Sequence, residues 1–261
     1  MRIDSNGLTF DVDVSGEGKP VLLLHGFPQS SHSWRLVREH LTDARTIAPD
    51  QRGYTPGTEG GSCAMPELVK DALGILDSLG IDTANVVGHD WGAAVAWQLA
   101  ARHPDRVRTL TAVSVPHPQA FIQALRTDED QRQKSQYMRT FSEPGYADTL
   151  LARFRDIFQP TPDNVDVDHM LAMASRPGAL DAWLQWYADQ KLEHSIDCPK
   201  VTVPTLHVWS TNDPALGRAG TEATAAWVDA PYRLEVFEGV SHWIPEEAAD
   251  RLGPLIHDHI T

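Results

Sequence analysis

A carboxylate between two glycines is the feature of this sequence best suited to chemistry. Asp90 lies in the middle of residues 88–92, with glycine two positions before and two after it. The apolar run 84–87 precedes it and the helix-forming run 93–99 follows, which predicts a strand, a sharp turn and a helix. Glycines leave room where a side chain would clash with such a turn. A carboxylate there can attack saturated carbon and leave an ester that water opens. The alternative is an ordinary aspartate that caps a helix.

The pattern resembles the nucleophile elbow of the α/β-hydrolase fold, with aspartate in place of the usual serine. A buried-strand run, residues 21–25, ends at Gly26, Phe27 and Pro28. In that fold the loop after this strand supplies one backbone N–H of the oxyanion hole, and the residue after the nucleophile supplies the other. The resemblance implies that the N–H groups of Phe27 and Trp91 form this hole.

The same fold orders its triad along the chain as nucleophile, acid and histidine. Among 12 histidines, His242 follows the strand pattern 233–237 and precedes the last helical pattern, where the fold carries its base. The strand pattern 205–209 runs into a turn that contains Asp213, whereas the pattern 107–113 runs into a turn without a carboxylate. Asp213 is therefore the acid expected to orient His242. An Asx turn is the structural alternative, and it is compatible with that role.

Composition narrows the classes of protein. The 261 residues are 41% hydrophobic, enough for one α/β domain with an insertion. A net charge of −14 argues against nucleic-acid and anionic-membrane partners. No stretch approaches the roughly 18 apolar residues of a membrane span, and the polar start lacks the core of a signal peptide. Cys63 and Cys198 lie in unrelated contexts, which suits a reducing cytoplasm and excludes a cysteine zinc site. We expect a cytoplasmic protein without a metal.

Strand and helix patterns alternate along most of the chain, which predicts a mostly parallel sheet with helices on both faces. Strands are expected at residues 8–14, 21–25, 46–49, 85–89, 107–113, 205–209 and 234–237. Helices are expected at about 33–40, 66–79, 92–101, 219–227 and 246–259. We expect an α/β-hydrolase core in residues 1–116 and 201–261. Residues 117–200 are helical throughout and predict an inserted cap over the carboxyl ends of the strands, where such sheets carry their sites.

Over nearly its whole length the chain resembles cap-bearing α/β-hydrolases of the epoxide hydrolase group. The matching motifs are residues 25–28, residues 52–54, the elbow at 88–92, and Gly239 with His242 and Trp243. Haloalkane and fluoroacetate dehalogenases share this framework, so these motifs do not identify the reaction. The residues of the cap must distinguish the reactions. Fluoroacetate dehalogenases carry an arginine after the nucleophile, where this chain has Trp91.

Epoxide hydrolases carry two cap tyrosines that donate hydrogen bonds to the epoxide oxygen. The segments around Tyr137 and Tyr187 are similar to those that carry them. An oxygen leaving as alkoxide needs a proton, and phenols with a pKa of about 10 keep theirs at neutral pH. A departing halide needs no proton and is bound instead by two N–H donors. Trp91 would supply one of these two donors. Helix packing is the structural alternative for the tyrosines. Trp183 and Trp186 flank Tyr187 and either line an apolar substrate pocket or pack in the core.

The resemblance implies a two-step reaction that needs no cofactor. Asp90 attacks a carbon of a small lipophilic epoxide while Tyr137 and Tyr187 protonate the opening oxygen. His242, oriented by Asp213, then activates water, which opens the ester and releases a vicinal diol. Two alternatives stay open: a haloalkane dehalogenase with the same triad, and a non-catalytic ligand-binding homologue, against which the intact triad argues. The sequence indicates no particular oligomeric state.

Overall fold

The computed structural model describes residues 1–159, 161–190 and 197–261. An eight-stranded sheet in the order β1-β2-β4-β3-β5-β6-β7-β8 forms its centre. Neighbouring strands from β4 to β8 are parallel, whereas β1 pairs with β2, and β2 with β4, in antiparallel fashion. The strands are β1 (Arg2–Ser5), β2 (Leu8–Ser15), β3 (Lys19–Leu24), β4 (Ala44–Pro49), β5 (Ala84–His89), β6 (Val107–Val113), β7 (Thr205–Ser210) and β8 (Tyr232–Phe237).

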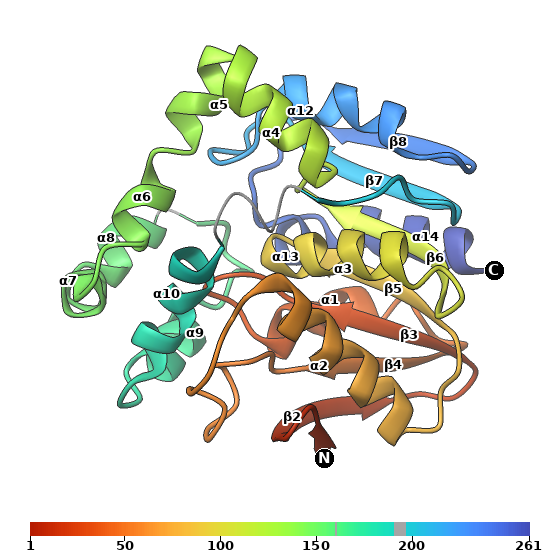
Figure 1. Cartoon of the computed structure of the whole chain (residues 1–261), viewed down its shortest axis with the longest axis horizontal. Helices are drawn as coiled ribbons and strands as arrows, with labels where there is room; N and C mark the ends of the chain where they lie inside the picture. Colours follow the sequence, from red (N-terminus) through yellow and green to blue (C-terminus); the bar gives the residue numbers. More distant parts are fainter. Residues whose placement is uncertain (160, 191–196) are drawn as a thin grey trace.

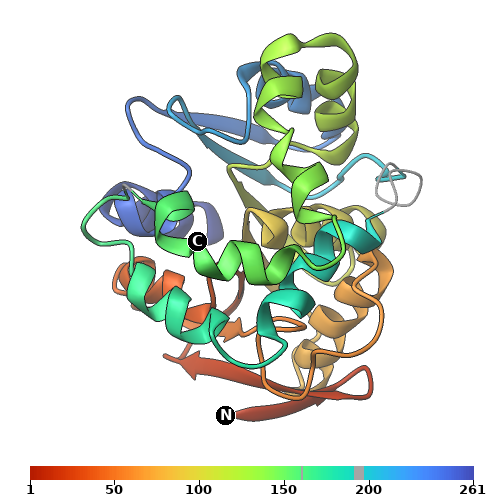
Figure 2. The ribbon, with the colours of Figure 1, turned by 90° about the vertical axis from the view of Figure 1, so that its left-hand side faces the viewer.

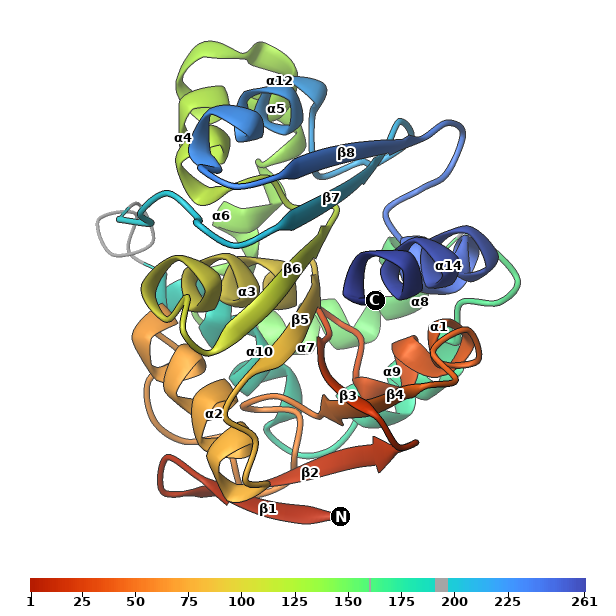
Figure 3. The same ribbon diagram turned by 90° about the vertical axis from the view of Figure 1, so that its right-hand side faces the viewer.

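Helices cover both faces of the sheet, as the alternating patterns predict. Figure 3 shows α2 (Met65–Ser78) and α3 (Trp91–Arg102) on one face, and α1 (Arg35–Arg38) and α14 (Ala249–Ile260) on the other. Each face has its own apolar core, one built around Trp97 and the other around Trp34. Because both faces are covered, the central strand β5 is buried along its whole length. The α/β-hydrolase architecture expected from the sequence is confirmed.

Between β6 and residue 190 the described residues form helices and no strand. These helices are α4 (Pro118–Thr127), α5 (Glu129–Lys134), α6 (Tyr137–Phe141), α7 (Tyr146–Ala152), α8 (Phe154–Phe158), α9 (Val167–Ala174) and α10 (Ala179–Asp189). Helices α6 to α10 lie together on one side of the sheet, at the left of Figure 1 and in front in Figure 2. Helix α4 instead packs against α12 (Arg218–Ala223), which precedes β8.

The sequence patterns missed or merged several short elements. The strand β1 was not expected because it has only four residues and Ile3 is its only apolar one, so its sequence shows no apolar alternation. The helical pattern 33–40 is a 3₁₀ turn, η1 (Ser31–Trp34), followed by α1. The pattern 219–227 divides likewise into α12 and η2 (Thr224–Trp227). The last helical pattern divides into α13 (Ile244–Glu247) and α14. Among the described residues no helix combines the length and apolar character that a membrane crossing needs.

Candidate active site

Asp90 occupies a strained turn between β5 and α3. Its backbone angles, φ 51° and ψ −124°, lie in a region that residues with a side chain rarely adopt. A side chain at Gly92 would overlap the main-chain oxygen of Leu24, so β3 and the start of α3 can approach only because Gly92 has no Cβ. A side chain at Gly26 would overlap Asp90 itself. A side chain at Gly88 would overlap the main-chain oxygen of Gly92, so both glycines that flank Asp90 in the sequence are needed for the sharp turn.

The carboxylate of Asp90 is buried, and its two oxygens have different surroundings. Oδ1 accepts a 2.8 Å hydrogen bond from the backbone N–H of Phe27. Oδ2 lies 3.4 Å from Nε2 of His242. Burial raises the pKa of Asp90, but the hydrogen bond and charge of His242 and the Phe27 N–H outweigh it and hold that pKa below its usual value. Asp90 is therefore ionised at neutral pH, as a nucleophile must be.

His242 lies between the two aspartates. Its Nδ1 is 2.7 Å from Oδ2 of Asp213, so the ring bridges from Asp213 to Asp90. Burial lowers the pKa of His242, yet the charges and hydrogen bonds of Asp213 and Asp90 together raise it to about 10. In the resting site His242 is thus an imidazolium held between two carboxylates.

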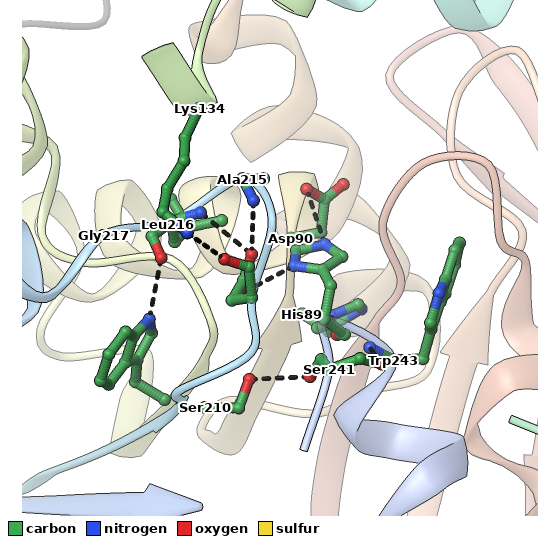
Figure 4. A network of polar contacts seen from close by, with 12 residues as sticks. His89, Asp90, Lys134, Ser210, Ala215, Leu216, Gly217, Ser241 and Trp243 are labelled. Carbon is green, nitrogen blue, oxygen red and sulfur yellow. Dashed lines mark hydrogen bonds and ion pairs between the residues drawn. The ribbon is translucent and has the colours of Figure 1, made fainter. Parts of the chain in front are cut away.

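Asp213 is fully buried, and backbone groups hold its side chain. Its Oδ1 accepts hydrogen bonds from the N–H groups of Ala215, at 2.8 Å, and Leu216, at 3.0 Å. This is the turn that the sequence indicated after β7. The N–H groups of Ala215 and Leu216, which Figure 4 labels, hold Oδ1, and this leaves Oδ2 directed at His242. The turn expected from the sequence and the contact with His242 therefore coincide at Asp213.

Three further side chains hold this arrangement, and the sequence reasoning missed them. His89 Nε2 donates a 2.9 Å bond to the main-chain oxygen of His242, and burial lowers the pKa of His89 to about 3. Lys134 Nζ donates a 2.6 Å bond to the main-chain oxygen of Asp213. The amide of Gln131 bonds to Ala215 O and Gly217 N, both at 2.8 Å. Lys134 and Gln131 lie three residues apart on α5, but nothing in their spacing identifies the loop they hold.

Tyr137 and Tyr187 lie together, with ring centroids 6.1 Å apart and their planes at 76°. Both line the cavity that contains Asp90. Burial, then the charge of Asp90, raises the pKa of Tyr137 above its ordinary value. Burial, then Tyr137 and Asp90, raises the pKa of Tyr187 in the same direction. Both phenols therefore keep their protons at neutral pH and remain donors.

The cavity at Asp90 has a volume of about 380 Å³ and mostly apolar walls. The apolar lining comprises Met65, Trp91, Ala94, Val115, Pro116, Pro118, Phe121, Ile122, Leu125, Met138 and Leu216. Such a cavity suits a small lipophilic molecule. A second, open depression of about 430 Å³ near Arg155 and Gln159 contains none of the predicted site residues.

Trp183 and Trp186 are not among the residues that line this cavity. Their indole N–H groups donate 3.0 Å bonds to the main-chain oxygens of Gly53 and Arg52. Trp183 also stacks on Tyr54, with centroids 4.4 Å apart. The expectation that they form a pocket wall is corrected: they attach α10 to the loop after β4. The reason is that a tryptophan with a buried N–H must find an acceptor, and backbone carbonyls supply it here.

The predicted residues thus form one site, since Asp90, His242 and Asp213 are in contact and Phe27, Trp91 and both tyrosines surround Asp90. Across the described ranges, no group of three or more histidine, cysteine or acidic side chains could hold a metal ion.

Comparison with known proteins assigns the family. The family model for the alpha/beta hydrolase fold matches residues 19–249. The chain is 31% identical to Epoxide hydrolase 3 of Xenopus tropicalis, over 100% of this chain and 77% of that protein. It is 32% identical to Epoxide hydrolase A of Mycobacterium tuberculosis, over 99% of this chain and 96% of that protein.

Solved structures agree. A structure described as one of the novel epoxide hydrolases in metagenomes from hot environments matches with a TM-score of 0.90 at 28% identity, over 100% of this chain and 98% of that one. Epoxide Hydrolase A from Mycobacterium thermoresistibile matches with a TM-score of 0.85 at 27% identity, over 99% and 97%. Together with the site geometry, these matches show that the chain belongs to the epoxide hydrolase group of the α/β-hydrolase superfamily.

Proposed function

We propose that this protein hydrolyses a small lipophilic epoxide to a vicinal diol through an ester formed on Asp90. The observation that carries the proposal is that the two oxygens of Asp90 have different contacts. Oδ1 is held by the Phe27 N–H, whereas Oδ2 accepts no backbone hydrogen bond and lies 3.4 Å from His242 Nε2. Oδ2 is therefore the nucleophile, and Oδ1 becomes the carbonyl oxygen of the ester.

The first step opens the epoxide ring. Asp90 Oδ2 attacks a ring carbon, the C–O bond breaks, and a proton from the Tyr137–Tyr187 pair neutralises the departing oxygen. General acids typically accelerate such steps by about 10²–10⁴-fold. Two buried phenols on separate helices, both raised in pKa and both beside Asp90, support this assignment.

The second step needs a neutral His242, and the first step helps to provide it. Esterification removes the negative charge of Asp90, which is one of the causes that raise the pKa of His242. The pKa of His242 must then fall, so the imidazolium can give up its proton, which replaces the one that the tyrosine pair donated, and His242 can act as a base. His242 takes a proton from water, which attacks the ester carbon, while the N–H groups of Phe27 and Trp91 bind the oxyanion. One such donor is typically worth about 10²–10³ in rate. When this intermediate collapses, the bond between the Asp90 carbonyl carbon and the diol oxygen breaks, and the departing oxygen takes the proton from His242.

We further propose that residues 117–200 act as the cap of this enzyme, because Tyr137 and Tyr187 both come from it and complete the cavity over Asp90.

The cysteines Cys63 and Cys198 are free and buried, and burial is the main cause that raises the pKa of each thiol to about 12. Unpaired thiols support the proposal of a cytoplasmic location.

Turnover of paired substrates tests the proposed function. Purified protein is offered aryl and alkyl epoxides beside bromoalkanes of matched size, with diol and bromide both measured. Epoxides are expected to react and bromoalkanes to react slowly or not at all. Faster bromide release would favour the dehalogenase alternative, for which Trp91 is the candidate halide donor. Binding without turnover of either class would favour the non-catalytic homologue.

A further inference from the structure

One face of α3 forms a wall of the cavity that begins at the nucleophile. Trp91, Ala94 and Gln98 all line the cavity, and their spacing of three and four residues places them on the same side of the helix. With a rise of 1.5 Å per residue, Gln98 lies about 10 Å along the helix from Trp91. The cavity therefore extends from Asp90 toward a polar side chain well beyond the reacting atoms.

Gln98 is unusual among the wall residues because it is polar and only 2% exposed. Its Oε1 accepts a 2.9 Å hydrogen bond from Nε of Arg102. A guanidinium can only donate, so this bond fixes which end of the amide is oxygen. The amide nitrogen Nε2 is thereby directed away from Arg102, and it makes no hydrogen bond to any part of the chain that the structure describes.

Gln98 Nε2 is not one of the fully enclosed polar atoms of the described residues, so it is open to the cavity that Gln98 lines. Beyond the proposed site, the other polar wall residues are Ser135, Arg139, Ser142 and Gln190, and all four are less buried than Gln98. A donor that faces a largely apolar cavity without a protein partner favours a ligand that supplies an acceptor.

We propose that Gln98 Nε2 is a specificity determinant that binds an oxygen atom at the far end of the substrate. The inference rests on the proposed function, since the epoxide ring places the other end of the substrate at Asp90. The substrate class is an epoxide that carries a hydroxyl, ether or carbonyl oxygen about 10 Å from the ring.

The far oxygen belongs to a neutral group. The ionised carboxylate of Asp90 lines the same cavity, and the protein carries a net charge of −14. Both disfavour a substrate with a carboxylate or phosphate. Arg139 is a cation that also lines the cavity, but it lies on α6 and is exposed to solvent. The single amide of Gln98 would not offset the desolvation of an anion at its own end of the cavity.

The test compares two terminal epoxides of equal length, one ending in a methyl group and one in a hydroxyl group, with a chain that spans about 10 Å. The measured quantity is the ratio of their kcat/KM values. Gln98→Leu, which retains the volume of the side chain, is expected to lower the hydroxyl-to-methyl ratio about 3- to 10-fold. The change should appear mainly in KM, because the hydrogen bond is present in the ground state and the transition state alike.

Two further variants separate the subsite from the structure of α3. Gln98→Glu keeps an acceptor for Arg102 but has no donor. It is tested with a methoxy-ended epoxide, whose ether oxygen can only accept, and it should lower the ratio of this substrate to the methyl-ended one as Gln98→Leu does. Arg102→Met removes the bond to Oε1 while leaving the amide in the cavity, so the ratio should stay within about twofold of the wild type.

An unchanged ratio in both Gln98 variants, with the methyl-ended epoxide still hydrolysed, overturns the subsite and leaves the proposed function intact. A wild-type protein that hydrolyses neither epoxide overturns the proposed function and the subsite with it.

Discussion

Lys134, on a helix of the insertion, donates a 2.6 Å hydrogen bond to the main-chain oxygen of Asp213, the residue that we propose as the acid of the triad. The bond links α5 directly to the loop after β7. Gln131, one turn earlier on α5, holds Ala215 and Gly217 of the same loop. The orientation of His242 therefore depends on a helix that precedes it by more than a hundred residues.

Replacing Lys134 tests whether this link positions Asp213. Lys134→Met retains the apolar stem and removes the donor, so Asp213 should orient His242 less well. We expect about a tenfold loss in the rate of ester hydrolysis, measured by single-turnover stopped flow, with a smaller effect on alkylation. Lys134→Arg should restore most of the rate. Equal losses in both steps, without rescue by arginine, would indicate a general loss of structure instead.

Replacing Tyr137 and Tyr187 tests whether their phenols act as the general acid of the first step. Tyr137→Phe or Tyr187→Phe alone should slow alkylation yet leave turnover, because the remaining phenol still donates. The double variant should lose alkylation by about 10²–10⁴-fold, more than the product of the single effects if the two donors are redundant. Ester hydrolysis should change little, since its charge develops at Phe27 and Trp91. A double variant that alkylates at the wild-type rate would remove both phenols from the mechanism.

The pH dependence of the second step follows from His242. A raised pKa means that the proton is held at neutral pH and is lost only as the pH approaches about 10 in the resting site. Once the ester forms, the charge of Asp90 is gone and the pKa is lower. The rate of ester hydrolysis should therefore rise with pH, with a midpoint below about 10. Single-turnover rates measured across this range would contradict the account if hydrolysis slowed as the pH increased.

The buried ion pair between Arg52 and Asp71 is expected to stabilise the folded protein. Arg52 donates two 2.7 Å bonds to the carboxylate of Asp71, and both side chains are over 90% buried. Asp71→Ala leaves a buried guanidinium unpaired and should lower the free energy of unfolding by about 3–5 kcal/mol. Lys200→Ala breaks an exposed pair with Asp229 and serves as the control, with little expected change. Urea titration of both variants measures the difference; similar losses would contradict it.

Much of the fold and the triad could be predicted because their signals are local. Alternation of strand and helix patterns marked the parallel sheet, and a glycine-bounded turn marked Asp90. The positions of Asp213 and His242 came from the order in which this fold places its triad. The structure brings these residues into contact.

The features that the sequence did not predict depend on contacts between distant segments of the chain. Gln131 and Lys134 belong to no motif, and their contacts with residues 213–217 exist only in the folded chain. Gln98 likewise belongs to no motif. The positions of Trp183 and Trp186 beside Tyr187 allow either a pocket wall or core packing. Their N–H groups need buried acceptors, which the loop at residues 52–53 provides, and this favours packing.

The central claim is that Asp90 forms an ester with the substrate. His242→Ala cannot activate water, although alkylation does not need that residue as a base. Intact-protein mass spectrometry after mixing with an epoxide should therefore show one adduct, which maps to the peptide containing Asp90. Single turnover of the wild type in ¹⁸O-water should release unlabelled diol, because the new hydroxyl oxygen comes from Asp90 Oδ2. Labelled diol in that first turnover would mean direct attack by water and would contradict the account.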